Sequence, residues 1–94
     1  AASDVYKRQI LRDMLLRRNS DPSLWFLLSE IQKDNLNVAG YHQSRAEYFI
    51  LLGQNERALN ELQFALKLSQ GNFQTFEIIM TKINNLREKL NKRI

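Results

Sequence analysis

The sequence has no cysteine, one histidine, one proline and three glycines among its 94 residues. Without cysteine the chain has no disulfide, no thiolate nucleophile and no cysteine-ligated zinc site. No apolar run approaches the roughly 18 residues that indicate a transmembrane helix. Apolar residues make up 44% of the chain and charged residues 26%, which is typical of a globular domain. A chain of this length holds at most one small domain.

Chemistry that depends on histidine has little support. His42 is the only imidazole, and a zinc site would need further ligands, for which Glu30 and Glu47 are the candidate carboxylates. We therefore expect His42 to be a half-buried packing or hydrogen-bonding residue. The sequence also has no G-x-S-x-G elbow and no glycine-rich phosphate loop. We predict no catalytic residue, no cofactor-binding residue and no metal ligand on this chain.

Positive charge is concentrated near the end of the sequence. The whole chain carries a net charge of +4, and residues 81–94 alone hold five basic residues against Glu88. Basic side chains at a helix C-terminus interact favourably with the helix dipole and usually face solvent. The alternative is that the segment from Arg87 to Arg93 binds nucleic acid or anionic lipid. No wide basic stripe and no aromatic stacking platform accompany it, so we expect no nucleic-acid partner.

Residues 1–9, with the sequence AASDVYKRQ, resemble the translation of a transposase sequencing adapter. We therefore expect residues 1–9 to be non-native and residues 10–94 to contain the fold. The alternative is a native helix start, in which Ser3 or Asp4 caps the helix and Val5 shares a face with Ile10.

Apolar residues recur at spacings of three and four along the whole chain, and no segment alternates with a period of two. This pattern predicts an all-α fold with helices over residues 10–18, 22–34, 38–52, 55–69 and 73–90. We expect Asp21 and Asn72 to be N-caps, and Gly53 and Gly71 to end the helices before them. Connections this short predict antiparallel neighbours.

Small and aromatic residues recur at fixed spacings, with Ala46 and Phe49 before Gly53, and Ala58, Leu62 and Ala65 after it. This spacing resembles that of a tetratricopeptide repeat. The resemblance implies antiparallel helix pairs of a solenoid, with repeat units over about 22–52 and 39–72 and a capping helix over about 72–92. His42, Arg45 and Gln70 depart from the usual motif. A plain helical bundle is the alternative. The residues expected to carry the repeat packing are Trp25, Leu28, Ala46, Phe49, Gly53, Ala58, Leu62 and Ala65.

Such repeats usually present a concave groove from their first helices. By the resemblance, the helices over 22–34 and 38–52 would form it together, and a mixed polar and aromatic lining would suit a peptide. The alternative is that this surface is solvated or contacts another domain. We also expect the capping helix to cover the preceding helix with Phe73, Phe76, Ile79 and Ile83. The expected partner-binding residues are Ser23, Phe26, Glu30, Lys33, Gln43, Glu47 and Ile50.

Four segments follow one another along the chain: 21–25 (DPSLW), 40–49 (GYHQSRAEYF), 58–68 and 71–73 (GNF). Their order resembles the C-terminal end of bacterial β-barrel assembly-enhancing proteases. The family consists of periplasmic zinc metallopeptidases with an HExxH catalytic domain followed by tetratricopeptide repeats. No HExxH occurs in this chain, so the resemblance implies that zinc belongs to an upstream domain.

The resemblance implies a non-catalytic docking or substrate-positioning arm in outer-membrane protein quality control, located in the periplasm. Its partners would be proteins or peptides, among them the outer-membrane assembly machinery and the upstream catalytic domain. One alternative is a generic tetratricopeptide scaffold unrelated to a protease. Another is nucleic-acid binding through the basic last helix.

Overall fold

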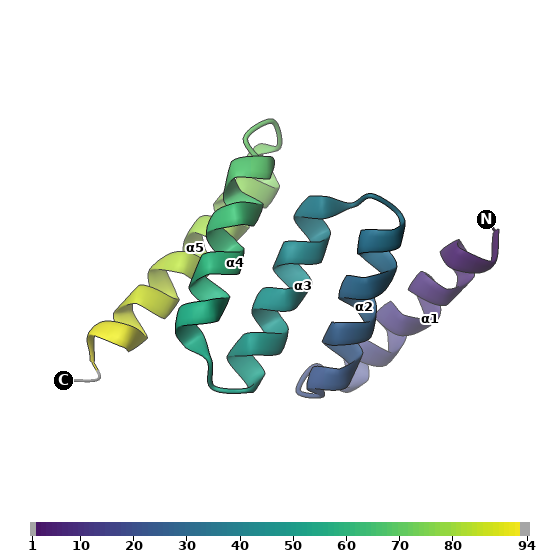
Figure 1. The fold of residues 1–94 in the computed structure, drawn as a ribbon, viewed down its shortest axis with the longest axis horizontal. Helices are drawn as coiled ribbons and strands as arrows, with labels where there is room; N and C mark the ends of the chain where they lie inside the picture. Colours follow the sequence, from purple (N-terminus) through teal and green to yellow (C-terminus); the bar gives the residue numbers. More distant parts are fainter. Residues whose placement is uncertain (1, 93–94) are drawn as a thin grey trace.

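The computed structural model describes residues 2–92, and within this range the chain forms helices and no strand, so the all-α prediction is confirmed. Consecutive helices run antiparallel, as the short connections predict (Figure 1). The helices are α1 (Ala2–Arg17), α2 (Pro22–Asp34), α3 (Val38–Leu51), α4 (Asn55–Leu68) and α5 (Phe73–Asn91).

The helices are arranged in two layers (Figure 1). Helices α2, α3 and α4 lie side by side in one layer, with α3 packed against both neighbours. Helices α1 and α5 lie behind this layer, where α1 packs on α2 and α5 packs on α4. The back of α3 is therefore bordered by α1 on one side and by α5 on the other.

Helix α1 is longer than the apolar spacing predicts, since it begins at Ala2 and not near Ile10. The helix thus runs through most of the segment that resembles an adapter. A helical conformation is compatible with either origin of that segment. Helices α3 and α4 each end one residue earlier than predicted, at Leu51 and Leu68.

Side-chain caps define where three helices start. Asp21 accepts a hydrogen bond from the Ser23 backbone N–H at 3.0 Å, and Pro22 occupies the first helical position. Asn72 caps α5 in the same way by accepting from the Thr75 N–H at 3.1 Å. Asn37 accepts from the Gly40 N–H at 3.1 Å and caps α3. The predicted caps at Asp21 and Asn72 are confirmed.

The two predicted glycine ends differ. Gly53 follows α3 with a φ of 75°, a left-handed conformation that glycine adopts without the Cβ penalty, as predicted. Gly71 does not have a positive φ, because Ser69 is the C-cap of α4 and Gly71 lies two residues later in the turn. The Ser69 hydroxyl donates to the Ala65 carbonyl oxygen at 2.8 Å and supports this end of the helix.

The apolar core is divided into two clusters. One joins α1 to α2 through Leu11, Leu15, Leu24 and Leu28, with Trp25 and Ile31 packed against it. The other joins α3, α4 and α5, and its centre consists of alanines and branched aliphatic side chains with almost no exposure. Its buried members are Ala46, Phe49, Ala58, Leu62, Ala65, Ile79, Ile83 and Leu86.

A polar seam separates the two clusters where α2 meets α3. Ser29 and Gln32 of α2 and Gly40 and Ser44 of α3 are all buried there. The Ser44 hydroxyl donates to the Gln32 side-chain oxygen at 2.6 Å. On the front of the same interface, Phe26 and Tyr48 lie with their ring centroids 5.5 Å apart. Short side chains along the seam let the two helices approach closely.

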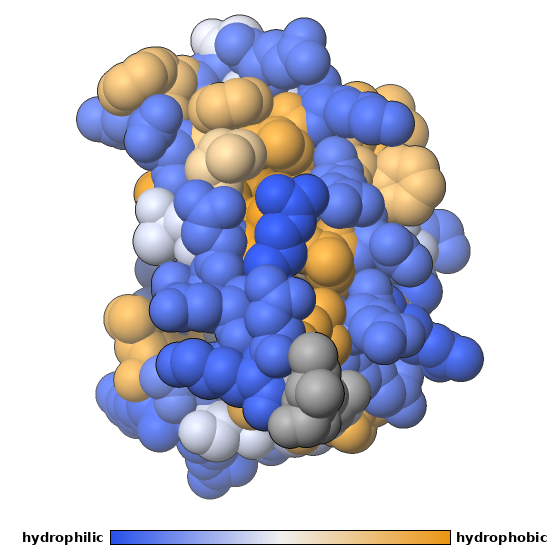
Figure 2. Space-filling model, turned by 90° about the vertical axis from the view of Figure 1, so that its left-hand side faces the viewer, coloured by the Kyte–Doolittle hydropathy of each residue, from blue (hydrophilic) through white to orange (hydrophobic). Residues whose placement is uncertain are grey.

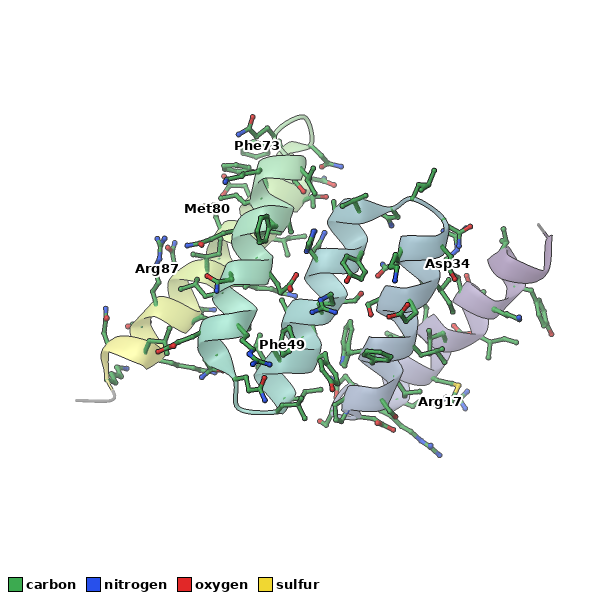
Figure 3. All side chains as sticks on the ribbon, viewed as in Figure 1. Arg17, Asp34, Phe49, Phe73, Met80 and Arg87 are labelled. Atoms are coloured by element: carbon green, nitrogen blue, oxygen red, sulfur yellow. The ribbon has the colours of Figure 1, made fainter. Side chains whose placement is uncertain are left out.

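Helix α5 covers α4 with fewer aromatic side chains than predicted. Ile79 and Ile83 are buried in the second cluster, and Phe76 is half-buried. Phe73 is 76% exposed, so its predicted packing role is wrong. The reason is the helical angle: at about 100° per residue, position 73 lies roughly a third of a turn away from the face of α5 that buries Ile79 and Ile83. Figure 3 shows Phe73 together with Met80 and Arg87 on the outer side of α5.

The end of the molecule formed by α4 and α5 carries an apolar stripe between hydrophilic side chains (Figure 2). Leu59 and Leu66 of α4 are only partly buried against the second cluster. The N-terminal end is also incompletely covered, since Ile10 and Met14 are about 40% exposed while Leu11 and Leu15 of the same helix are buried.

We predict that Ala65→Leu destabilises the fold by about 1–3 kcal/mol, because a larger side chain overpacks the fully buried α3–α4–α5 contact. Urea unfolding followed by circular dichroism measures the change in free energy of unfolding. Asn60→Leu, at an exposed position of the same helix, is the control and should change this free energy little. Equal stability of Ala65→Leu and the wild type would contradict the close-packing account.

We predict that Ser23→Ala raises the pKa of Asp21. The Ser23 hydroxyl donates to the Asp21 carboxylate at 2.6 Å, and this hydrogen bond is the main cause that lowers its pKa below the ordinary 3.8. A lowered carboxyl pKa stabilises the fold above the ordinary value, and the contribution is lost as the pH falls through the folded-state pKa. A carboxyl-carbon NMR titration of both proteins measures the shift. An Asp21 pKa that does not change on substitution would refute this role of the hydroxyl.

Candidate binding groove

A groove of about 600 Å³ lies behind α3, between α1 and α5. Each of the five helices contributes to its lining, as do the turns before α3 and α5. Seven of the sixteen lining residues have polar, uncharged side chains, and the three charged ones have both signs. The lining residues are Arg12, Trp25, Leu28, Gln32, Asn37, Ala39, Gly40, Gln43, Ser44, Glu47, Leu68, Ser69, Gly71, Asn72, Thr75 and Lys82.

The polar seam forms the floor of this groove. Gln32, Gly40 and Ser44 line the groove, and the same residues hold α2 against α3. A Cβ atom at Gly40 would lie 2.7 Å from the Gln32 side-chain nitrogen and 2.5 Å from that of Asn37. Only glycine therefore leaves both amides in place at this position. The floor of the groove therefore depends on the close approach of α2 and α3, which also joins the two core clusters.

Charged side chains stand on the two sides of the groove. Lys82 of α5 forms an ion pair with Glu47 of α3, with its Nζ atom 2.5 Å from the Glu47 Oε1 atom. This pair connects α3 to α5, which otherwise meet through their apolar faces. Arg12 of α1 lies on the other side. The groove thus has one ion pair at its α5 border and a guanidinium at its α1 border.

The structure does not bring the seven predicted binding residues together. Gln43 and Glu47 line the groove, while Ile50 is partly buried against the second core cluster. Ser23 and Phe26 line a separate hollow of about 360 Å³ with Tyr48.

The other two predicted residues, Glu30 and Lys33, form an ion pair at 3.6 Å and line neither cavity. The expectation of one shared surface is wrong.

Helical geometry explains this difference. Helix α2 presents Trp25, Leu28 and Gln32 to the groove. At about 100° per residue, positions 23, 26, 30 and 33 lie about half a turn away and face the opposite side of the layer. The repeat pattern predicted that α2 faces the groove with positions 23, 26, 30 and 33. In the structure α2 lines the groove with its other face, and α1 borders it as well.

Several groove residues were not predicted, among them Arg12, Lys82 and Asn72. The position of Gln32 could have been predicted from the sequence, because Gln32 follows Leu28 by one helical turn on the face of α2 that packs inward. The positions of Arg12 and Lys82 could not, since a single basic residue on an amphipathic helix is usually solvated. Their position follows only from where α1 and α5 pack in the tertiary structure.

His42 is held in a second polar cluster at the α3–α4 interface. Its Nδ1 atom lies 2.5 Å from the Glu61 carboxylate, which also accepts from the Arg45 Nε–H at 3.1 Å. The ring stacks on Phe64 at 5.2 Å and is 20% exposed. The prediction of a half-buried, hydrogen-bonded histidine is confirmed. His42 and Arg45 of α3 share the one carboxylate of Glu61 on α4, so the cluster connects α3 to α4 and does not line the groove.

The part of the chain that the structure describes contains no group of three or more His, Cys, Asp and Glu side chains able to hold a metal. None of its helices is long and apolar enough to cross a membrane. At the end of α5, Arg87, Lys89 and the C-cap residue Lys92 are exposed, whereas Lys82 is engaged with Glu47. Arg93, part of the predicted basic end, lies outside the described residues.

Comparison with known proteins identifies no relative. No family model, no curated protein and no solved structure matches this chain.

We predict that Ser44→Ala destabilises the fold by about 1–3 kcal/mol, because the buried Gln32 oxygen loses its donor. Ser29→Ala is the matched control. Ser29 is also buried, but its hydroxyl donates to the Phe26 carbonyl oxygen within its own helix, and that oxygen remains in the helical ladder. Both variants gain the same helix propensity, so the difference between their free energies of unfolding measures the contribution of the hydrogen bond between Ser44 and Gln32. Equal values for the two variants would contradict the role of the Gln32–Ser44 bond.

Proposed function

We propose that this chain is a non-catalytic protein–protein interaction module that binds a polypeptide segment in the groove between α1 and α5. One observation carries the proposal: residues from all five helices border a single groove of about 600 Å³. Its amide and hydroxyl side chains offer donors and acceptors for a peptide backbone. Apolar and charged groups beside them offer contacts for side chains.

We also propose that the helices follow tetratricopeptide-like pairing, with α1–α2 and α3–α4 as units and α5 as the start of a third. A repeat of this class has a period of about 34 residues. Stepping by that period relates Leu15, Phe49 and Ile83, and all three are buried. It likewise relates Leu28 of α2 to Leu62 of α4, which are also buried. This pairing differs from the unit over 22–52 that the sequence favoured, and it assigns the groove to α1, α3 and α5.

A narrower hypothesis is that the module is the docking arm of a periplasmic zinc metallopeptidase that acts with the outer-membrane assembly machinery. Its support is the sequence resemblance of segments 21–25, 40–49, 58–68 and 71–73. The described residues supply no donor set for zinc, so no zinc chemistry is assigned to this chain. Reading the source DNA upstream of the Ile10 codon tests this hypothesis. An in-frame HExxH followed by further helical repeats would support it, and repeats without that motif would leave a scaffold protein.

The groove proposal predicts that random peptides displayed on phage are enriched by the full chain and that Gln43→Trp abolishes their binding. Gln43 lines the groove, so the indole fills the space that a peptide would occupy. Fluorescence polarisation of the enriched peptides measures the affinity, and circular dichroism checks that the variant is folded.

Lys33→Trp is the matched control, because it adds the same side chain at an exposed position outside the groove. Its affinity should equal that of the wild type. Peptides that bind Gln43→Trp as tightly as the wild type would show that another surface is used. Absence of any enriched peptide would also count against the proposal.

A further inference from the structure

The end of the molecule formed by α4 and α5 carries a surface that is separate from the groove. An apolar stripe runs along this end between hydrophilic side chains (Figure 2). Helix α4 contributes Leu59 and Leu66, which are only partly buried, and α5 contributes Phe73, Phe76 and Met80. We call these five residues the end stripe. Phe73 is 76% exposed, so most of an aromatic side chain faces solvent here.

On α4, the end stripe lies on the flank that faces away from α3. Glu61 of α4 binds side chains of α3, so it marks the flank that α3 covers. Relative to the buried Leu62, Leu59 and Leu66 are rotated by about 40–60° in the direction opposite to Glu61, at about 100° per residue. The two leucines therefore point to the open end of the molecule.

On α5, the end stripe lies on the outer side of the helix. Positions 73, 80 and 87 are spaced seven residues apart and therefore share one face. Figure 3 shows Phe73, Met80 and Arg87 together on this side. The groove lies on the other flank of α5, where Thr75 and Lys82 border it.

The contact between α3 and α4 shows how this fold covers such a face. The two helices lie antiparallel (Figure 1), and Ala46 and Phe49 of α3 are only 0% and 8% exposed in their shared core cluster. At the same contact, Glu61 accepts a hydrogen bond from Arg45 at 3.1 Å. A covered face here combines apolar burial with an ion pair between antiparallel helices. No helix within residues 2–92 covers the end stripe in this way.

Two opposite charges lie at the two ends of the end stripe. Glu77 lies one turn after Phe73, near the start of α5, and Arg87 lies near the end of the helix. Both are exposed, and neither forms an ion pair with another described side chain. When two copies of α5 lie antiparallel, the Glu77 end of one copy meets the Arg87 end of the other. Parallel copies would instead place like charges side by side, which is unfavourable.

The spacing of the end stripe also fits a two-fold arrangement. Met80 is seven residues from Phe73 and seven from Arg87, so a two-fold axis at Met80 places Phe73 of one copy opposite Arg87 of the other. A guanidinium over an aromatic ring is a favourable contact. The same contact occurs within this fold, where the Arg57 guanidinium lies 5.8 Å from the centre of the Phe49 ring.

We propose that two copies of this chain associate through the end stripe, with their α5 helices antiparallel and Met80 at the two-fold axis. Arg87 of each copy then contacts Phe73 and Glu77 of the other. Such a contact closes with two copies, because both use the same surface. The groove stays open on the other flank of α5, so the inference goes beyond the proposed function and does not depend on it.

Sedimentation equilibrium of the full chain over a range of concentrations tests the association. We expect the average mass to rise with concentration from the 11.1 kDa of one chain towards twice that value. A mass that stays at one chain up to about 1 mM, a concentration at which even weak dimers form, would overturn the inference.

Two charge reversals test the arrangement of the copies. Glu77→Arg and Arg87→Glu each place like charges across the contact, so each should raise the dissociation constant about tenfold or more. An equimolar mixture of the two variants restores opposite charges at both ends of the stripe and should associate about as tightly as the wild type. Arg87→Cys, which only removes the guanidinium, should also weaken the association.

Asp34→Arg and Arg17→Glu are the matched controls for the charge reversals. They reverse an acidic and a basic charge at exposed positions of α2 and α1, outside the end stripe. Both variants should associate like the wild type.

Met80→Asp tests the apolar centre, because it places two carboxylates next to each other at the two-fold axis. This variant should also raise the dissociation constant about tenfold or more. Ile78→Asp is its control, since Ile78 is 54% exposed and lies on the opposite side of α5. Circular dichroism checks that every variant is folded.

A mixture of Glu77→Arg and Arg87→Glu that stays monomeric while both variants are folded would overturn the inference. A wild-type dimer that neither the charge reversals nor Met80→Asp weakens would do the same, because another surface would then hold the copies together. Peptide binding to the groove should be equal for Glu77→Arg and the wild type. Failure of the dimer and failure of the proposed function are therefore distinguishable.

Discussion

A buried hydrogen bond from the Ser44 hydroxyl to the Gln32 side chain crosses the boundary between two separate apolar cores. One core joins α1 to α2, and the other joins α3, α4 and α5. Apolar packing alone would specify each block, because each buries its own leucines, isoleucines and alanines. The relative position of the blocks depends on the α2–α3 seam, where small and polar side chains meet. A polar bond of this kind is directional, so it selects one register of the two helices.

The groove is a consequence of that division. Its floor is the seam itself, and its two sides belong to different blocks, α1 to one and α5 to the other. Gly40 keeps the space in which the Gln32 and Asn37 amides lie. The Glu47–Lys82 pair attaches the second side of the groove to α3. A ligand that touches both sides would therefore bind the two blocks at once, and its affinity would depend on how firmly the seam holds them.

Local sequence signals predicted the helices well and the groove only in part. Helix ends are determined by contacts within a few residues, at Asp21, Asn72 and Gly53. All three positions were predicted. The buried Ala46, Ala58 and Ala65 were also identified from their spacing. Which face of α2 borders the groove was not predicted, because it depends on where α1 packs. Helix periodicity defines opposite faces of α2 but does not state which of them a distant helix covers. Phe73 shows the same limit, since it lies at the edge of the apolar side of α5 and its burial depends on which part of that side packs against α4.

The most direct test of the account is the distance between the two blocks. The chain contains no cysteine, so Arg17→Cys and Arg87→Cys, both at exposed positions, provide specific sites for a pair of spin labels on α1 and α5. Pulsed electron–electron double resonance then measures the distribution of distances between them. The account predicts one narrow distribution, within the 48 Å length of the molecule. A broad distribution, or several populations, would show that the seam does not hold the blocks in one arrangement and that no fixed groove exists between them.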